Sequence, residues 1–177
     1  LFAVVPASGK PTTLNGLGMF LPWQRRLLNV DATAALQVYH DHWLRMETRR
    51  ERPDGTPEVD MNDCLKSSLR MRPDRIIVGE VRGPEAATLL TAMNTGHDGS
   101  FGSLHANTAQ ETVTRMINPP MNVPPIMLSG LDLIIIQARL HVNGSTVRKI
   151  TEVAEIAGME GTKPRLNIIW KYNAAND

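Results

Sequence analysis

The sequence has few of the features that mark secreted or membrane-spanning proteins. Its 177 residues contain one cysteine, Cys64, which excludes an internal disulfide and a four-cysteine zinc site and is typical of a reducing compartment. No apolar run approaches the roughly 20 residues that cross a bilayer, and no segment resembles a secretory signal. These absences favour a cytoplasmic protein.

A surplus of one charge is also missing. The chain has 19 Lys and Arg against 18 Asp and Glu, which gives a formal net charge of +1 with histidine neutral. Because binding to nucleic acid through bulk charge needs a positive surplus, we expect no nucleic-acid partner. Hydrophobic residues make up 42% of the chain, enough for a core, and the length favours one domain. The chain begins with an apolar run at residues 1–5, so we expect a fragment whose first strand is cut at its start.

Short β-branched runs alternate with helical patterns over much of the chain. This alternation predicts an α/β fold with a mostly parallel sheet and crossover helices. An antiparallel hairpin is expected near the end, because two apolar runs flank Asn143-Gly144. The predicted strands are 1–5, 26–30, 76–78, 100–104, 131–142, 146–156 and 165–172, and the predicted helices are 12–20, 60–72, 84–95 and 108–117. Segment 32–49 is ambiguous, with a short strand allowed at 43–46.

A phosphate-binding loop is predicted at residues 6–13, which read PASGKPTT. Such a loop needs a glycine, four residues and then Gly-Lys-Ser/Thr, so that backbone N–H groups wrap the phosphates while the lysine reaches the terminal ones. The candidate nucleotide-binding residues are Ser8, Gly9, Lys10, Thr12 and Thr13.

Two positions of this loop depart from the pattern. Val4 stands where the first glycine belongs, and Pro11 replaces the hydroxyl that would hold magnesium. Proline also removes one backbone donor and disfavours a helical conformation at Lys10. Taken alone, the segment is equally compatible with an ordinary surface turn.

Longer motifs are more specific. Residues 69–83 read LRMRPDRIIVGEVRG, residues 95–99 read TGHDG, and residues 103–107 read SLHAN. In this order they resemble the superfamily of secretion and type IV filament ATPases, the RecA-like motors of type II and type IV secretion, pili and archaella. Residues 111–133 look most like its archaeal branch. The resemblance runs over nearly the whole chain.

The resemblance implies a RecA-like P-loop NTPase core that uses ATP and Mg²⁺, with Thr12 and Glu80 as possible contacts to the magnesium of the nucleotide. It implies a homo-oligomer, a hexameric ring, that acts on a membrane platform protein from the cytoplasmic side of the cell membrane. Residues 1–177 would then form the carboxyl-terminal domain of a longer protein whose amino-terminal domain lies upstream.

The resemblance also implies roles for individual residues. Glu80 matches the end of the Walker B motif, where a carboxylate orients the attacking water, and His97 and His105 match the histidines that sense the terminal phosphate. Arg45 and Arg49 match arginines that are expected to reach a phosphate, either within the subunit or across a subunit boundary. Two alternatives stay open: residues 45–52 form a solvated basic face, or the two histidines bind zinc together with Glu80.

One family motif is altered. The Asp box of the family reads Ile-Glu-Asp-Thr-x-Glu-Leu, and residues 30–36 here read VDATAAL. Asp31 keeps a carboxylate and is a candidate catalytic residue, whereas Ala32 and Ala35 keep no charge.

Three functions are therefore compatible with the sequence: a secretion or filament-assembly ATPase, a nucleotide-binding or structural ring subunit impaired in hydrolysis, and a metal-dependent hydrolase built on the two histidines. The first requires that Lys10, Glu80, His97 and His105 converge on one cleft at one edge of the sheet.

Overall fold

Eight strands form a single sheet in the computed structural model, which describes residues 1–4, 8–142 and 144–174. The elements are β1 (Phe2–Val4), α1 (Lys10–Gly18), β2 (Leu27–Asp31), β3 (Trp43–Glu47), α2 (Met61–Leu69), β4 (Arg75–Val78), α3 (Glu85–Asn94), β5 (Phe101–Leu104), α4 (Ala109–Ile117), the 3-10 helix η1 (Pro125–Gly130), β6 (Leu133–Val142), β7 (Ser145–Glu160) and β8 (Lys163–Lys171). No helix in these described ranges is both long and apolar enough to span a bilayer.

The strands are arranged in the order β3-β2-β4-β5-β1-β6-β7-β8. All neighbours from β3 to β6 are parallel, whereas β6, β7 and β8 pair antiparallel. The prediction of a mostly parallel α/β sheet with an antiparallel hairpin is confirmed. The predicted turn at Asn143 lies outside the described residues.

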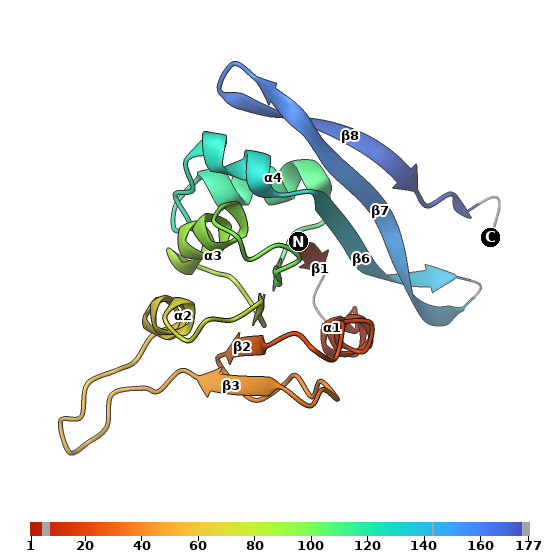
Figure 1. Ribbon diagram of the computed structural model, residues 1–177. Coiled ribbons are helices and arrows are strands. Elements are labelled where there is room, and N and C mark those ends of the chain that lie inside the picture. The colour runs from red at the N-terminus through yellow and green to blue at the C-terminus, as the bar shows by residue number, and fades with distance from the viewer. Residues whose placement is uncertain (5–7, 143, 175–177) are drawn as a thin grey trace.

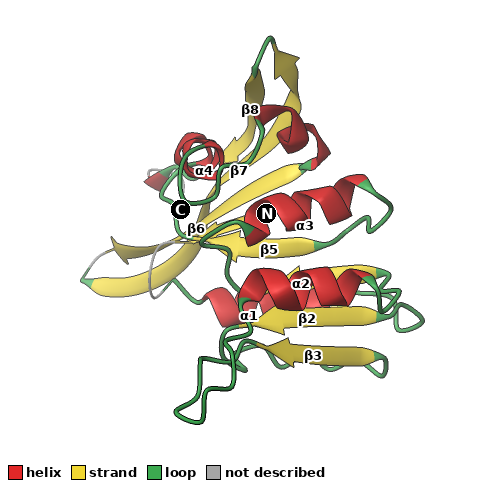
Figure 2. Cartoon of the chain, turned by 90° about the vertical axis from the view of Figure 1, so that its left-hand side faces the viewer, coloured by secondary structure: helices red, strands yellow, loops and turns green. Residues whose placement is uncertain are grey.

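Helices cover both faces of the parallel part of the sheet. Helices α2, α3 and α4 lie on one face and α1 lies on the other (Figures 1 and 2). Alternate residues of β4 show the division, since Ile76 and Val78 belong to the larger hydrophobic cluster and Ile77 belongs to the smaller cluster beneath α1. Successive side chains of a strand point to opposite faces, so a strand buried on both faces is apolar throughout.

Local signals explain where two of the helices begin. Asp60 accepts a hydrogen bond from the backbone N–H of Asp63, and Asp63 accepts one in return from Asp60, which forms a capping box at the start of α2. Helix α1 begins at Lys10, although Pro11 disfavours a helical conformation at that residue. Proline is tolerated there because backbone N–H groups in the first turn of a helix have no partner within the helix. Segment 32–49, whose structure was ambiguous from the sequence, contains β3, which is the outermost strand on one side of the sheet.

The parallel arrangement determines where functional groups gather. The carboxyl ends of β1, β2, β4 and β5 lie along one edge of the sheet, which is where ligands bind in open α/β sheets. The predicted phosphate-binding loop follows β1, Asp31 ends β2, Gly79-Glu80 follows β4, and His105 follows β5.

We predict that Leu14 anchors α1 to the sheet. Its side chain is buried in the smaller cluster, so Leu14→Ala is expected to lower the free energy of unfolding by about 2–5 kcal/mol, measured by denaturant unfolding. Leu44→Ala, on the partly exposed edge strand β3, is the control and is expected to cost less than about 1 kcal/mol. Equal losses would contradict this description of α1.

Candidate functional site

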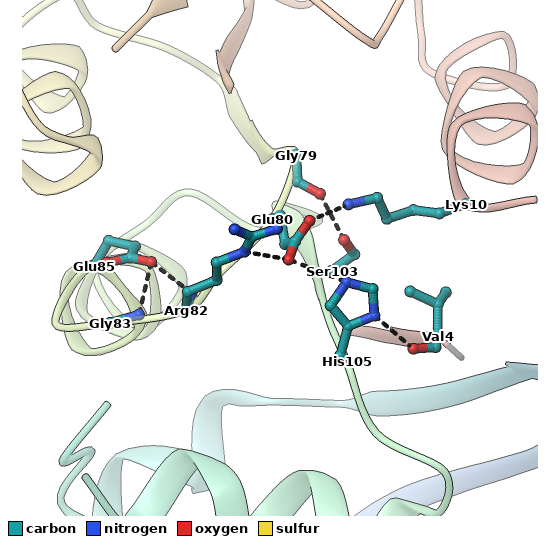
Figure 3. A network of polar contacts seen from close by, with 9 residues as sticks. All are labelled: Val4, Lys10, Gly79, Glu80, Arg82, Gly83, Glu85, Ser103 and His105. Atoms are coloured by element: carbon teal, nitrogen blue, oxygen red, sulfur yellow. Dashed lines mark hydrogen bonds and ion pairs between the residues drawn. The ribbon is translucent and has the colours of Figure 1, made fainter. Parts of the chain in front are cut away.

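The carboxylate of Glu80 is the centre of a polar network at the carboxyl edge of the sheet (Figure 3). Lys10 Nζ lies 2.7 Å from Glu80 Oε2, and Arg82 Nε donates to Oε1. His105 Nε2 lies 3.1 Å from Oε1. Three segments, from α1, from the β4–α3 connection and from the end of β5, thus meet at one side chain that is 14% exposed.

These contacts keep Glu80 charged. Burial alone would raise the pKa of its carboxyl, but hydrogen bonds from Arg82 and Lys10 outweigh burial and lower the pKa from 4.5 to about 2. A carboxylate with so low a pKa is a weak proton acceptor at neutral pH. The arrangement is therefore suited to orienting a water or a cation rather than to removing a proton outright.

The backbone before Glu80 is fixed by the neighbouring strands. A Cβ on Gly79 would lie 2.1 Å from Asp31 Oδ1, so only glycine fits beside the end of β2. Ser103 Oγ donates to the Gly79 carbonyl oxygen at 2.5 Å. Asp31 itself is buried, which raises the pKa of its carboxyl, and its Oδ2 has no hydrogen-bond partner among the described residues.

Glu85 fixes the backbone that presents Arg82. Its Oε1 accepts from the backbone N–H of Arg82 at 2.6 Å and from that of Gly83 at 2.8 Å (Figure 3). Neither Arg82 nor Glu85 was among the site residues predicted from the sequence. An acidic residue in the first turn of a helix often accepts hydrogen bonds from backbone N–H groups two or three positions earlier in the chain. That spacing is the sequence signal that would identify Glu85 and Arg82.

His105 bridges two acceptors. Its Nδ1 lies 3.0 Å from the carbonyl oxygen of Val4, and its Nε2 faces Glu80. A neutral imidazole can donate from only one nitrogen, so only the protonated ring makes both hydrogen bonds at once. The ring therefore links the end of β1 to the end of β4.

The phosphate-binding loop leads directly into α1. Gly9 has a φ of 95°, a left-handed conformation that favours glycine, and is the N-cap residue of the helix. Ser8 is buried, and its Oγ has no partner among the described residues. Gln137 of β6 secures this segment, since its Nε2 donates to the Ser8 carbonyl at 2.6 Å and its Oε1 accepts from Thr13 Oγ1 at 2.7 Å. Gln137 was not among the site residues predicted from the sequence.

A cavity of about 650 Å³ opens between Lys10, Glu80 and the end of β2. The altered Asp box forms part of its wall through Asp31, Ala32 and Ala35. The cavity thus has two methyl groups where the family motif would place carboxylates. Its remaining lining residues are Thr33, Thr48, Arg50, Met61, Arg82 and Glu85.

The structure does not bring His97 into this cleft. His97 lies in the connection before β5, whereas His105 follows β5, so the two histidines lie at opposite ends of the strand. The same connection, through Asp98, Gly99 and Ser100, lines a separate cavity beside Leu1 at the amino end of β1. The expectation that all four side chains converge is met by Lys10, Glu80 and His105, and His97 is the exception.

Arg45 and Arg49 also lie outside the cleft of their own chain. Arg45 Cζ lies 5.0 Å from the ring centre of Trp43 on β3, and Arg49 donates to the carbonyl of Pro57 at 3.1 Å. Arg50 lines the cavity instead, as does Thr48, because alternate residues of an extended segment face the same side. Arg50 was not predicted as a site residue, because the arginines of residues 45–52 were treated as one basic segment.

The geometry bears on the zinc alternative. His97 and His105 cannot share one metal ion across the length of β5, and no group of three or more His, Cys, Asp or Glu side chains in the described part of the chain is placed to hold a metal. Magnesium carried by a nucleotide would meet no hydroxyl at Pro11, and both oxygens of Glu80 already have partners.

Comparison with known proteins assigns these features to a family. The family model described as "Type II/IV secretion system protein" matches residues 6–164. An uncharacterized protein of Methanocaldococcus jannaschii is 39% identical over 150 residues, which cover 85% of this chain and 55% of that protein. The conjugal transfer protein TrbB of Rhizobium radiobacter is 43% identical over 91 residues, 51% of this chain and 26% of that protein.

Two solved structures share the fold. The VirB11 ATPase of the Brucella suis type IV secretion system, in complex with sulphate, matches with a TM-score of 0.70 and 28% identity over 87% of this chain and 47% of that one. The pilus retraction motor PilT with bound ADP matches with a TM-score of 0.58 and 26% identity over 98% of this chain and 48% of that one. The chain thus spans about half the length of these proteins.

We predict that Glu80 makes folding sensitive to acid. Its pKa is lower in the folded chain, about 2 against an ordinary 4.5, so its stabilising contribution is complete above pH 4.5 and is lost as the pH falls toward 2. Glu80→Gln cannot ionise, so its free energy of unfolding is expected to fall less steeply across this window in denaturant unfolding at a series of pH values.

Asp31→Asn is the matched control for the pH series. Because burial raises the pKa of Asp31, its protonation on acidification acts in the opposite sense, and removing it should steepen the decline. Parallel pH profiles for the native chain and Glu80→Gln would contradict the ion-paired description of Glu80.

Proposed function

Because the chain belongs to the type II/IV secretion system protein family, we propose that it is the ATP-binding motor domain of a secretion or type IV filament assembly ATPase. In this proposal, ATP hydrolysis drives protein secretion or filament assembly. The domain works as part of a hexameric ring against a membrane platform protein, at the cytoplasmic face of the cell membrane.

One observation carries the proposal: the ion pair between Lys10 and Glu80. It joins the predicted phosphate-binding loop after β1 to the carboxylate after β4, two segments 70 residues apart in the sequence. A loop that presents a lysine and a left-handed glycine at a helix start suits phosphate groups, and a carboxylate beside it suits an attacking water. The relatives support this function, since the VirB11 structure holds sulphate and the PilT structure holds ADP.

Each residue has a role that its position allows. Ser8, Gly9, Lys10, Thr12 and Thr13 form the phosphate end of the site, and Lys10 exchanges Glu80 for the phosphates when nucleotide binds. Glu80 then orients the attacking water, with its carboxylate still held by Arg82. The ring of His105, next to Glu80, donates a hydrogen bond that offsets negative charge developing on the terminal phosphate.

Other predicted residues act at longer range in this proposal. Asp31, buried beside Gly79, shapes the cleft and is the one carboxylate left of the Asp box. Arg45 and Arg49 lie on an exposed part of the edge strand and its extension, where they can reach the nucleotide of a neighbouring subunit. His97, at the opposite edge of the sheet, would respond to nucleotide only through such a subunit contact.

The residues present fit phosphate better than magnesium. When bound, magnesium neutralises phosphate charge and aligns the terminal phosphoryl group. Pro11 supplies no hydroxyl ligand, and the oxygens of Glu80 are already occupied by Lys10 and Arg82. We therefore assign no step of the mechanism to the metal.

The same observations favour a second candidate, a nucleotide-binding or structural ring subunit that is impaired in hydrolysis. Of the departures from the family motifs, Ala32 and Ala35 line the cleft and Pro11 follows Lys10 in the first turn of α1, while the sheet and helices around them are intact. The loss of one contact to a developing charge costs about 10²–10³ in rate, so several such losses would silence turnover in a folded domain.

We predict that Pro11→Thr separates the two candidates. The substitution restores a hydroxyl and a backbone N–H, and the first turn of α1 should accept threonine without strain. If the chain is an impaired ATPase, nucleotide binding by titration should change little, while phosphate release should rise by about tenfold or more. Val4 is left unchanged, because it is 2% exposed and fills the end of β1.

Controls make the outcome clear. Pro11→Thr combined with Glu80→Gln should bind nucleotide and release no phosphate above background, and Lys10→Ala should bind weakly. High phosphate release from the unaltered chain would reject the impaired candidate. No nucleotide binding, even with Pro11→Thr, would reject both candidates.

A further inference from the structure

Another cavity lies beside Glu80, on the side of β5 and α4. Its volume is about 250 Å³. In the sheet, β4 stands between β2 and β5, so the carboxylate that follows β4 separates this cavity from the cleft at the end of β2. We call the cavity the α4 pocket, because it reaches that helix. Its polar lining consists of Glu80, Arg82, His105 and Arg115, and its apolar wall of Val81 and residues 119–121.

The α4 pocket and the cleft share one wall. Glu80 and Arg82 line both cavities, whereas Lys10 lines the cleft and Arg115 of α4 lines the pocket. Figure 3 shows Lys10 and Arg82 reaching Glu80 from opposite sides. An anion that moved from the cleft to the pocket would pass the Glu80–Arg82 ion pair and would exchange contact with one cation for contact with another.

Two arginines supply hydrogen-bond donors to the α4 pocket. Within the described part of the chain, Arg82 uses Nε on Glu80, and Arg115 uses Nε and Nη2 on Glu111. A guanidinium carries five N–H donors, so both arginines keep donors that a ligand can use. Both side chains are more than half exposed, which lets them turn toward such a ligand. The planar guanidinium can bind two oxygens of one phosphate at once.

The charge of Glu80 does not exclude an anion from this pocket. Lys10 and Arg82 already compensate that carboxylate. Arg115 is paired with Glu111, but the pair is exposed and lies four residues apart on one helix, so the attraction between its charges is weak. Arg115 can therefore exchange Glu111 for a more highly charged ligand.

The size and the apolar wall of the α4 pocket favour a small anion. Its volume lies below the usual range of about 300–1,000 Å³ for sites that hold drug-sized molecules. Val81 and Met121 are buried, and their side chains offer no acceptor that would compete for the arginines. An apolar wall also lowers the local dielectric constant, which strengthens the attraction between a guanidinium and an anion.

The proposed function produces an anion of this kind. In hydrolysis the oxygen of water bonds to the terminal phosphorus, the bond to the bridging oxygen breaks, and its electron pair stays on ADP. One proton goes to the solvent, and the products are ADP and inorganic phosphate. The phosphate forms beside Lys10 and Glu80 while ADP still occupies the loop. An exit on the far side of Glu80 would release phosphate before ADP.

Resting on the proposed function, we propose that the α4 pocket binds inorganic phosphate and that product phosphate leaves the cleft through it. Arg82, which lines both cavities, accompanies the ion past Glu80, and Arg115 binds it in the pocket. The Glu80–Arg82 pair is then the partition between the site of hydrolysis and the exit.

A nucleotide that fills the cleft isolates the α4 pocket. AMP-PNP, a triphosphate that resists hydrolysis, occupies the position of the terminal phosphate, so inorganic phosphate added to this complex can bind only elsewhere. Calorimetric titration of inorganic phosphate into the AMP-PNP complex is expected to show binding by the unaltered chain and about tenfold weaker binding by Arg115→Ala. The affinities of the two chains for AMP-PNP should differ by less than about twofold.

Glu111→Gln is the matched control. It breaks the same ion pair on α4 but keeps the guanidinium of Arg115, so it should bind phosphate at least as tightly as the unaltered chain. Arg115→Lys keeps the charge without the planar fork and should have an intermediate affinity. Because an exposed ion pair adds little stability, thermal unfolding of all three variants should match that of the unaltered chain.

Two results would overturn the inference while the proposed function stands. If the AMP-PNP complex of the unaltered chain did not bind phosphate, the pocket would be rejected, whether or not the free chain bound it. Equal phosphate affinity in Arg115→Ala and Glu111→Gln would show that Arg115 does not contact phosphate. If the unaltered chain did not bind AMP-PNP, the proposed function would fail, and an exit for its product would fail with it.

Discussion

The ion-paired carboxylate of Glu80 is the interaction on which this edge of the sheet depends. A carboxylate that is 14% exposed remains charged only if neighbouring groups compensate for the lost water, and here Lys10 and Arg82 do so, with His105 alongside. These partners come from segments that follow three different strands. The carboxylate can therefore be satisfied only when β4, β5 and β1 lie side by side in the observed order, so fold and site require each other.

Much of this arrangement could be predicted from the sequence because it depends on local patterns. Buried parallel strands are apolar throughout, and this pattern predicts a strand at residues 76–78. Asp60 is a typical N-cap residue and predicts the start of α2. The grouping of Lys10 with Glu80 followed from strands whose carboxyl ends share one edge. His97 was predicted to lie in the cleft together with His105, but the two histidines flank β5. Residues that come before and after one strand lie at its opposite ends, so only His105 lies at the carboxyl end.

The contributions of the hairpin could not be predicted in the same way. Gln137 and Arg148 lie more than 120 residues beyond the loop that they contact, and nothing near them in the sequence marks them as partners of Ser8 or Gly9. Similarly, the choice of Arg50 over Arg49 depends on which side of an extended segment faces the cavity, and a shift of one residue reverses it. Such pairings are set by tertiary packing.

Gln137 has a mechanical consequence. The nitrogen and the oxygen of its side-chain amide join the β6–β7 hairpin to both sides of Gly9, the N-cap residue of α1, through Ser8 and Thr13. The curvature of the loop and the tilt of the hairpin therefore cannot vary independently. A displacement of the long antiparallel ribbon is therefore transmitted to the turn at Gly9, and by thermodynamic reciprocity a change of conformation at this turn acts on the ribbon with the same coupling energy.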